Sequence, residues 1–384
     1  MQSPHYNLIV IGAGVLGSFH AYHAAQKGLK VLLLEKDNMP MEATVRNFGQ
    51  IVPSGMSQGK WQDYGRRSIE VYKSLQEKVN ISIRQNGSIY IASDESELTL
   101  LEELAAINQK NNYTSSLFSK QECLIKYAGL NGDYCKGGLF FPEEITAEPH
   151  QLIHLLIAYL KEQLKVVYQP NTLVTFCDYV NGKCVVEDNL GKAYTGDKVI
   201  ICNGRDFKNL FTELFYNSGI EVSKLQMMKT VPVYNYSLPG SILTGLSIRR
   251  YESFHECPSY NSLSASKNED EFKKWGIHVL FKQAIDGSLI IGDSHEYADA
   301  GEQDKLGFAV NHEINNIILE EAKRIMDLPT WEIASSWNGY YAQCKNHDIF
   351  NYEVAPNVHI ITAIGGKGMT ASAGLAEATI RQLF

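Results

Sequence analysis

Metal sites, membrane spans and secretion signals have little support in this sequence. Its seven cysteines are scattered without a Cys-x-x-Cys pair, so we expect no metal site and reduced thiols in a cytoplasmic protein. No apolar run reaches the roughly eighteen residues that a membrane span needs. Residues 1–6 contain no basic cluster ahead of the first apolar run, so we expect no signal peptide.

Positive charge is also in deficit, with 35 Lys and Arg against 43 Asp and Glu. The formal net charge of −8 argues against a general nucleic-acid partner, although a few buried cations can still hold a small anion. The 384 residues are 44% hydrophobic and 20% charged, without repeats or low-complexity tracts. This composition describes a soluble globular protein of two domains, whose oligomeric state stays open.

The most informative motif lies near the amino terminus. An apolar run ends in Gly12-Ala-Gly14-Val-Leu-Gly17 and enters a helical stretch, and a second apolar run, residues 31–34, precedes Glu35. This spacing is typical of a dinucleotide-binding βαβ unit. Gly12 permits the turn, Gly14 admits a pyrophosphate, Gly17 lets helix and sheet pack, and Glu35 can accept hydrogen bonds from a ribose diol. The alternative is an ordinary turn in a doubly wound sheet.

A second glycine loop occurs near the carboxyl terminus. A strand over residues 358–362 is followed by Gly365-Gly366-Lys367-Gly368-Met369-Thr370 and a helix over 370–383. Such a helix start aims N–H groups and a positive dipole at an anion. Nicotinamide enzymes do not need this second element, whereas a reduced flavin gains from positive charge beside its ring. We therefore expect both ends of the chain to meet at one cofactor, with a simple helix cap as the alternative.

The residues between the two loops predict further helices and strands. Helices are expected over 61–79, 95–110, 149–164 and 313–326. Strands are expected over 88–92, 138–141, 166–168, 172–176, 183–187 and 198–202. Residues 222–293 are expected to be mostly β, with a hairpin over 280–291 that turns at Asp286-Gly287.

Several of these segments together resemble the D-amino-acid oxidase superfamily of FAD-dependent oxidoreductases, which includes glycine oxidase and sarcosine oxidase. They are residues 12–17, Glu35, and residues 44–49, 146–149, 199–204 and 365–370. The resemblance covers nearly the whole chain. Residues 46–50, 249–259 and 291–297 are similar to a subgroup associated with phosphonate catabolism.

The resemblance implies an α/β fold class in which a Rossmann-type FAD-binding domain is interrupted by a β-rich (α+β) substrate domain. The FAD-binding domain would comprise residues 1–80, 146–215 and 333–384, and the substrate domain residues 81–145 and 216–332. Thr44 would contact the pyrophosphate, Arg46 and Asn47 would lie by the ribityl chain or flavin ring, and the Val174 backbone would meet adenine. The full implied FAD set is Gly12, Gly14, Val15, Leu16, Gly17, Glu35, Lys36, Thr44, Arg46, Asn47, Phe48, Gly49, Val174, Asn203, Gly204, Gly339, Gly365, Gly366, Lys367, Gly368, Met369 and Thr370.

Two departures from the family pattern occur in Trp337-Asn-Gly339-Tyr340-Tyr341. Gly339 stands where covalently flavinylated sarcosine oxidases carry cysteine, so we expect FAD to be bound non-covalently. Cys344 lies close by, but its placement does not fit an attachment site. Tyr341 stands where glycine oxidase has the arginine that holds the α-carboxylate, which makes a standard α-amino acid a poorer substrate.

Four cations are candidates for holding a substrate anion, because phosphonate is bound by arginine forks or by lysine. They are Arg46, Arg249, Arg250 and Lys367. Arg46 can instead serve the cofactor alone, and Lys367 can support the reduced flavin, attract superoxide or be solvated. If the adjacent Arg249 and Arg250 lie on a strand, only one of them faces the pocket.

Histidines and aromatic residues supply the remaining candidates. His295 is preferred as a pocket base over His255 and His278, although most isolated histidines are structural. Tyr251, Trp337, Tyr340 and Tyr341 can wall an ammonium cage, or simply pack in the core. Lys367, His295 and Tyr341 are our candidates for catalytic residues.

These observations predict a FAD-dependent amine oxidoreductase that passes hydride from carbon to flavin N5 and releases an imine for hydrolysis. The subgroup resemblance implies an aminophosphonate substrate, such as a 2-aminoethylphosphonate derivative, with dioxygen as electron acceptor. The alternatives are an oxidase of glycine, sarcosine or other N-methyl or D-amino acids, and a flavin dehydrogenase with another acceptor. A non-catalytic FAD-binding protein and a nicotinamide enzyme also stay open.

Overall fold

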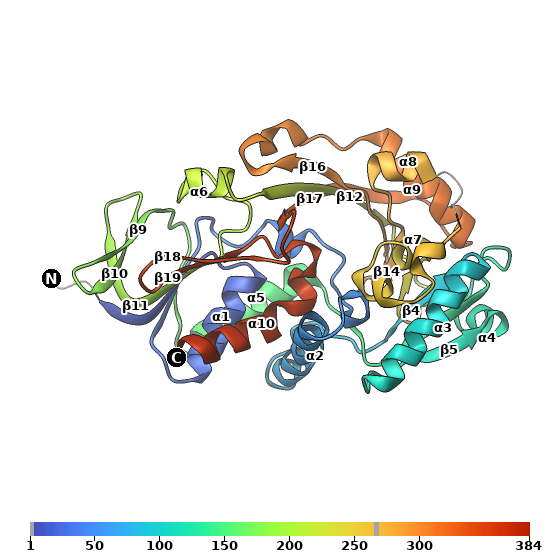
Figure 1. The fold of residues 1–384 in the computed structure, drawn as a ribbon, viewed down its shortest axis with the longest axis horizontal. Coiled ribbons are helices and arrows are strands. Elements are labelled where there is room, and N and C mark those ends of the chain that lie inside the picture. The colour runs from blue at the N-terminus through green and yellow to red at the C-terminus, as the bar shows by residue number, and fades with distance from the viewer. Residues whose placement is uncertain (1–3, 265–268) are drawn as a thin grey trace.

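The computed structural model describes residues 4–264 and 269–384, which form an elongated molecule with one large β-sheet in each half (Figure 1). Residues 1–3 of the segment where we expect no signal peptide lie outside the described part. The first described strand and the carboxyl-terminal helix both lie in the half at the left of Figure 1. Every helix in the two described ranges is too short or too polar to cross a lipid bilayer.

The eight-stranded sheet is built around parallel strands with buried, apolar sequences. Its main path in space is β18 (Phe350–Ala355), β19 (Val358–Thr362), β11 (Ala193–Ile201), β1 (His5–Ile11), β2 (Val31–Leu34) and β8 (Val167–Gln169). β1 is parallel to both β2 and β11, and burial on both faces explains why its apolar residues are consecutive rather than alternating. β10 (Lys183–Asp188) and β9 (Val174–Val180) extend antiparallel from β11.

Helices α1 (Val15–Gln26), α5 (Pro149–Glu162) and α10 (Gly368–Leu383) pack on this sheet, and α2 (Lys60–Lys78) packs against α10 (Figure 1). The approach of α2 and α10 is close because Gly374 has no side chain, and a Cβ there would clash with the Tyr64 carbonyl oxygen. Tyr72 Oη donates a hydrogen bond of 2.8 Å to the Met369 carbonyl oxygen. This contact fixes the first turn of α10, which matters for the site below.

The nine-stranded sheet occupies the other half. Its main path is β16 (Glu296–Asp299), β12 (Ile220–Thr230), β15 (Leu289–Gly292), β14 (Leu280–Gln283), β13 (Ser241–Leu243), β4 (Ser88–Ala92), β6 (Gly137–Phe141) and β5 (Ser116–Ser119). β17 (Ile333–Cys344) pairs with β12 along nearly its whole length. Helices α3 (Glu95–Lys110), α4 (Lys120–Lys126) and α9 (His312–Ile325) accompany this sheet, and β3 (Gln50–Ile51) pairs separately with β7 (Ile145–Thr146).

The position of β17 corrects one expected domain boundary. We expected residues 333–384 to belong to the FAD-binding domain, but β17 is a strand of the nine-stranded sheet because its partner is β12. Its far end also reaches the other half, where Gln343 forms a β-bridge with Ile364. β17 therefore joins the nine-stranded sheet to the carboxyl-terminal glycine loop.

The expectation of mostly β structure over residues 222–293 is wrong for its middle part. Helix α7 (Gly245–Ile248), a 3₁₀ turn (Glu252–Glu256) and helix α8 (Glu269–Trp275) occupy much of the stretch between β13 and β14. A capping box between Thr244 and Ser247 starts α7, a local signal that the alternation of apolar residues hid. The hairpin β14–β15 and the four helices predicted between the two glycine loops are confirmed, with ends shifted by no more than two residues.

Candidate functional site

Both glycine loops line one cavity of about 1100 Å³ that runs along the carboxyl ends of β1, β2, β11 and β19. All the residues that we expected to contact the cofactor line it, from Gly12 to Thr370. In doubly wound sheets, ligands bind beyond the carboxyl ends of the strands, as here. The two ends of the sequence therefore meet at a single site.

The amino-terminal loop forms a cradle with free space and N–H donors. Gly12 has a φ of +98°, and a Cβ there would clash with the Cys202 carbonyl oxygen. Gly14 faces Thr44, whose Oγ1 accepts a hydrogen bond of 3.0 Å from the Val15 N–H and so holds the loop against the start of α1. The first turn of α1 leaves further N–H groups without helical partners, which suits an anion such as a pyrophosphate.

Glu35 is held rigidly at the end of β2. Its Oε2 accepts a hydrogen bond of 2.8 Å from the Ala13 N–H, and its Oε1 accepts one of 3.1 Å from the Asp37 N–H. Burial raises the pKa of Glu35, although both of these hydrogen bonds favour the charged form. Its carboxylate lies beside the cradle, where the motif predicts a ribose.

The carboxyl-terminal loop forms the second cradle. Residues Gly365–Lys367 make a 3₁₀ turn that leads into α10 at Gly368, and Gly365 has a φ of +67°. Thr370 Oγ1 accepts a hydrogen bond of 3.2 Å from the Val52 N–H, so the start of α10 is tied to the loop after β3. A Cβ on Gly366 would lie 3.7 Å from Tyr341 Oη, which places this turn beside the end of β17.

Asn203 and Asn47 differ in whether their side chains have a polar atom free to bind a dinucleotide. Asn203 Oδ1 is buried at the cavity without a hydrogen-bond partner, and such an atom calls for a ligand donor. Asn47 is different, because its amide donates to the carbonyl oxygens of Ala43 and Thr44 and accepts from the Gly49 N–H. Its side chain therefore folds the loop rather than facing the cofactor with a free polar group.

Arg250 is a cation that lines the cavity. It donates a hydrogen bond of 3.2 Å to Tyr297 Oη, and its neighbours include Tyr251 and Tyr341. No carboxylate among the described residues lies within ion-pairing distance of it. The guanidinium is therefore available for an anionic ligand.

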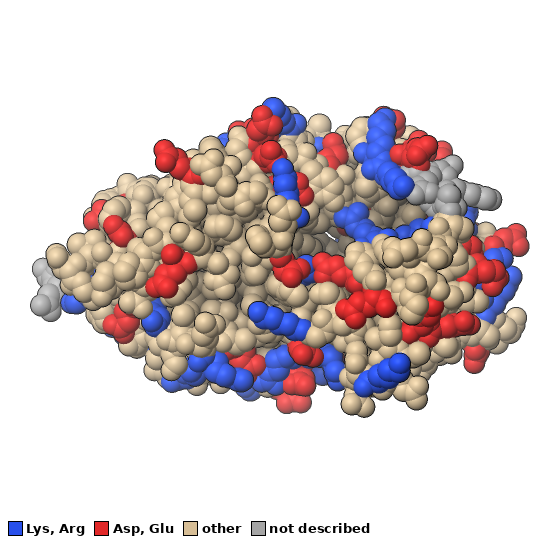
Figure 2. Space-filling model, viewed as in Figure 1, with Lys and Arg blue, Asp and Glu red and all other residues tan. Residues whose placement is uncertain are grey.

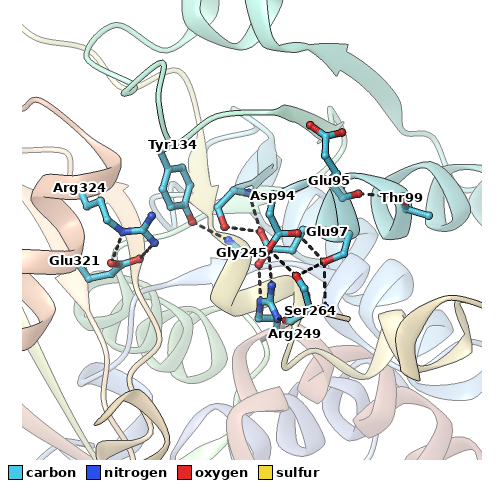
Figure 3. Close-up of polar contacts among 12 residues, drawn as sticks. Asp94, Glu95, Glu97, Thr99, Tyr134, Gly245, Arg249, Ser264, Glu321 and Arg324 are labelled. Carbon is cyan, nitrogen blue, oxygen red and sulfur yellow. Dashed lines mark hydrogen bonds and ion pairs between the residues drawn. The ribbon is translucent and has the colours of Figure 1, made fainter. Parts of the chain in front are cut away.

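Arg249 does not line the cavity, which corrects its assignment as a substrate-binding candidate. Its guanidinium bonds Glu97 Oε1 at 2.5 Å, Asp94 Oδ2 at 2.7 Å and the Ser264 carbonyl oxygen at 2.6 Å (Figure 3). Glu97 is only 1% exposed and needs a cation as partner. Of the two arginines, Arg250 lines the cavity and Arg249 does not, and the pair lies at the end of α7 and not on a strand.

Lys367 lines the cavity but is not a free cation. Its Nζ lies 2.7 Å from Glu252 Oε1 and 2.8 Å from Asp348 Oδ1, and it lies 5.2 Å from the centre of the Trp61 ring. These carboxylates raise the pKa of Lys367 although burial alone would lower it. Lys367 thus links the 3₁₀ turn after Tyr251 to the carboxyl-terminal loop.

Some of the remaining candidate residues line the cavity, and others do not. His278, His295, Tyr251, Tyr340 and Tyr341 line it, whereas Trp337 and His255 do not. Trp337 Nε1 instead donates a hydrogen bond of 3.3 Å to the Arg46 carbonyl oxygen. His255 is exposed, and its ring contacts the ring of Tyr260.

Arg46 lines the cavity but turns its Nε to the Met41 carbonyl oxygen at 2.7 Å. Sequence reasoning missed Arg205, which lies over the Tyr340 ring at 4.6 Å and bonds Glu42. Its place directly after Asn203-Gly204 was the available signal. Among the described residues, no three potential metal ligands converge on one point.

The face of the molecule shown in Figure 2 carries charges of both signs. Among the described residues on that face, Lys and Arg are interspersed with Asp and Glu rather than gathered into one basic patch.

Comparison with known proteins identifies the family. Residues 7–382 match the family model of FAD dependent oxidoreductases known as DAO. An opine oxidase chain of Agrobacterium tumefaciens is 21% identical over 97% of this chain and 92% of the relative. Two solved structures share the fold: L-proline dehydrogenase from P. horikoshii (TM-score 0.80, 18% identity, 100% and 94% coverage) and L-alpha-glycerophosphate oxidase from Mycoplasma pneumoniae with FAD bound (TM-score 0.79, 18% identity, 99% and 95% coverage). The chain belongs to the DAO family of FAD-dependent oxidoreductases, with FAD as its cofactor.

Proposed function

We propose that this protein oxidises the C–N bond of a small anionic amine, and that the substrate is an aminophosphonate such as a 2-aminoethylphosphonate derivative. The observation that carries this proposal is Arg250, a guanidinium at the cavity without a carboxylate partner among the described residues. A phosphonate matches the arginine fork in shape and charge. The resemblance of residues 46–50, 249–259 and 291–297 to a phosphonate-associated subgroup supports the same substrate.

Bound FAD would supply the hydride acceptor. The protein itself binds the cofactor and the substrate and orients them toward each other. The two cradles fix the position of the cofactor, since each lines the same cavity. Arg250 holds the anionic end of the substrate, so that its C–N bond is presented at the carboxyl-terminal loop. Tyr251 and Tyr341 line the cavity beside Arg250 and help to shape the space in which the substrate is oriented. Gly339 stands at the family's attachment position and offers no nucleophile, which supports non-covalent binding of FAD; Cys344 also lines the cavity, but its place in the sequence does not match the attachment position.

The main alternative within this reaction type is an amino acid substrate. The two most relevant relatives are named for nitrogen-containing substrates, an opine and L-proline, whereas a third is named for a phosphate ester. Arg250 can hold a carboxylate as well as a phosphonate. Tyr341 stands where glycine oxidase has its carboxylate-binding arginine, which argues against a standard α-amino acid.

Anaerobic mixing of the purified yellow protein with a panel of amines tests the proposal. We expect aminophosphonates to bleach the flavin absorbance faster than glycine, sarcosine or D-amino acids at equal concentration. Readmission of air then separates an oxidase, which recovers its colour, from a dehydrogenase, which needs an artificial acceptor. If no aminophosphonate bleaches the flavin, the proposed substrate is wrong.

A substitution at Arg250 separates binding of the anion from binding of FAD. We expect Arg250→Ala to raise the aminophosphonate concentration needed for half-maximal reduction by about tenfold or more, with the flavin content unchanged. Arg381→Ala is the matched control, because Arg381 is an exposed arginine paired with Glu377 far from the cavity lining. Equal substrate dependence in both variants would remove Arg250 from the site.

A further inference from the structure

Asp293 is a buried carboxylate whose hydrogen-bonding capacity is only partly used inside the protein. It follows β15 directly, lines the same cavity as Arg250, and is 6% exposed. Its Oδ1 is buried without a hydrogen-bond partner. A native protein seldom leaves a buried carboxylate oxygen in this state, so the group calls for a ligand donor.

Two imidazoles face Asp293 without neutralising it. His278 Nδ1 lies 3.4 Å and His295 Nδ1 lies 3.7 Å from Asp293 Oδ1. His295 Nδ1 donates to the Gly276 carbonyl oxygen at 3.1 Å, so its proton is already engaged. Burial lowers the pKa of His278, and lowers that of His295 to about 4, so both rings are neutral near pH 7.

The orientation of His278 follows from its other neighbour. Ser247 Oγ accepts a hydrogen bond from the Thr244 N–H at 3.1 Å and lies 2.9 Å from His278 Nε2. When the Ser247 hydroxyl donates to Nε2, the proton of the imidazole is on Nδ1, toward Asp293. This arrangement favours the ionised carboxylate.

Asp293 and Arg250 carry opposite charges at two separate places in the cavity. Burial alone would raise the pKa of Asp293, but the pKa is lowered overall; with both imidazoles neutral near pH 7, the hydrogen bond from His278 and the charge of Arg250 are the causes that favour the ionised carboxylate there. Asp293 and Arg250 are not joined to each other by an ion pair or a hydrogen bond. The other titratable groups facing Asp293, Tyr251 and Tyr341, have pKa values raised by burial and remain neutral. Asp293 and Arg250 therefore offer an anion and a cation to a ligand in the same cavity.

We propose that Asp293 binds the amino group of the substrate while Arg250 binds its anionic group, so that the site selects zwitterions. This inference rests on the proposed function and adds a specificity-determining residue to it. The neutral imidazoles allow a positively charged nitrogen to approach Asp293 without repulsion. The ligand class is a short chain that carries an ammonium group at one end and a phosphonate at the other.

Ligand binding to the holoenzyme tests the proposal with two compounds of nearly equal shape. 2-Aminoethylphosphonate carries an ammonium where propylphosphonate carries a methyl group. Dissociation constants come from the change in flavin absorbance under anaerobic conditions, or from the concentration dependence of flavin reduction for a compound that is oxidised. We expect the wild-type protein to bind the amino compound about tenfold or more tightly than propylphosphonate.

Asp293→Asn is expected to abolish most of this preference. The variant should bind 2-aminoethylphosphonate more weakly than the wild type does, and it should bind propylphosphonate equally well or more tightly. Asp299→Asn, at an exposed aspartate of β16 paired with Lys345, is the matched control and should keep the wild-type preference. If wild type shows no preference, or Asp293→Asn keeps it, this inference alone is wrong. If neither compound binds to wild type, the proposed substrate is wrong as well. The wild-type comparison tests the selection of zwitterions even if the variant does not fold.

Discussion

Two adjacent arginines differ in function because of what each can reach. Arg249 meets the buried carboxylate of Glu97, and Arg250, one position further along the end of α7, meets the cavity. The sequence shows two identical side chains and gives no sign of which one is engaged. The assignment depends on Glu97, which lies more than 150 residues earlier in the chain and is brought close only by packing of α3 on α7.

This difference predicts separate effects of the two alanine variants. Arg249→Ala should lower the free energy of unfolding by about 3 kcal/mol, because it leaves Glu97 buried without a cation. Arg250→Ala, which breaks no ion pair within the described residues, should change it by no more than about 0.5 kcal/mol. Urea denaturation followed by intrinsic fluorescence measures both. Equal loss of stability in the two variants would contradict the assignment of Arg249 to a structural role.

At the scale of single elements, the two glycine loops were predictable because their signals are local. Strand, glycines, helix and acid follow one another within 30 residues around Gly12, and strand, glycines and helix do so around Gly366. The four long helices were predictable for the same reason. The membership of β17 in the second sheet and the role of Asp293 were not, since each depends on a partner distant in sequence.

The first cradle gives a prediction about cofactor retention. A Cβ at Gly17 would clash with the Gly12 carbonyl oxygen, so Gly17→Ala must push α1 away from the turn. We expect the purified variant to contain less than about half of the wild-type flavin, because the N–H groups of α1 would then be misplaced. The ratio of flavin to protein absorbance measures this.

The control for this variant is Gly132→Ala, whose Cβ would meet its nearest neighbour, Leu124, at an ordinary 3.7 Å. It should keep the wild-type flavin content. A full complement of flavin in Gly17→Ala would show that the close packing of α1 on the turn is not needed to hold the cofactor.

For the whole molecule, buried histidines set part of the pH dependence of stability. Burial lowers the pKa of His20, His23 and His295 to about 4, well below the value of about 6.5 in an unfolded chain. Between these values the unfolded chain binds more protons, so the free energy of unfolding falls as the pH falls from about 6.5 to about 4. Each histidine contributes up to about 1.4 kcal/mol per pH unit in this window.

His23→Gln tests one of these contributions away from the cavity. His23 Nε2 lies 2.9 Å from the Ala373 carbonyl oxygen, and a glutamine amide can donate there in its place. We expect the slope of unfolding free energy against pH to be shallower in this variant between pH 4 and pH 6.5. Unchanged slopes would mean that His23 is not held neutral in the folded protein.

The joining of both cradles at one cavity has a consequence for biosynthesis. The cofactor pocket combines β1 with a glycine turn and helix, Gly368–Leu383, that are synthesised much later. A nascent chain in which α10 has not yet been made therefore exposes only half of the pocket. Flavin capture must follow translation of α10, and a chain truncated before Gly365 is expected to be colourless.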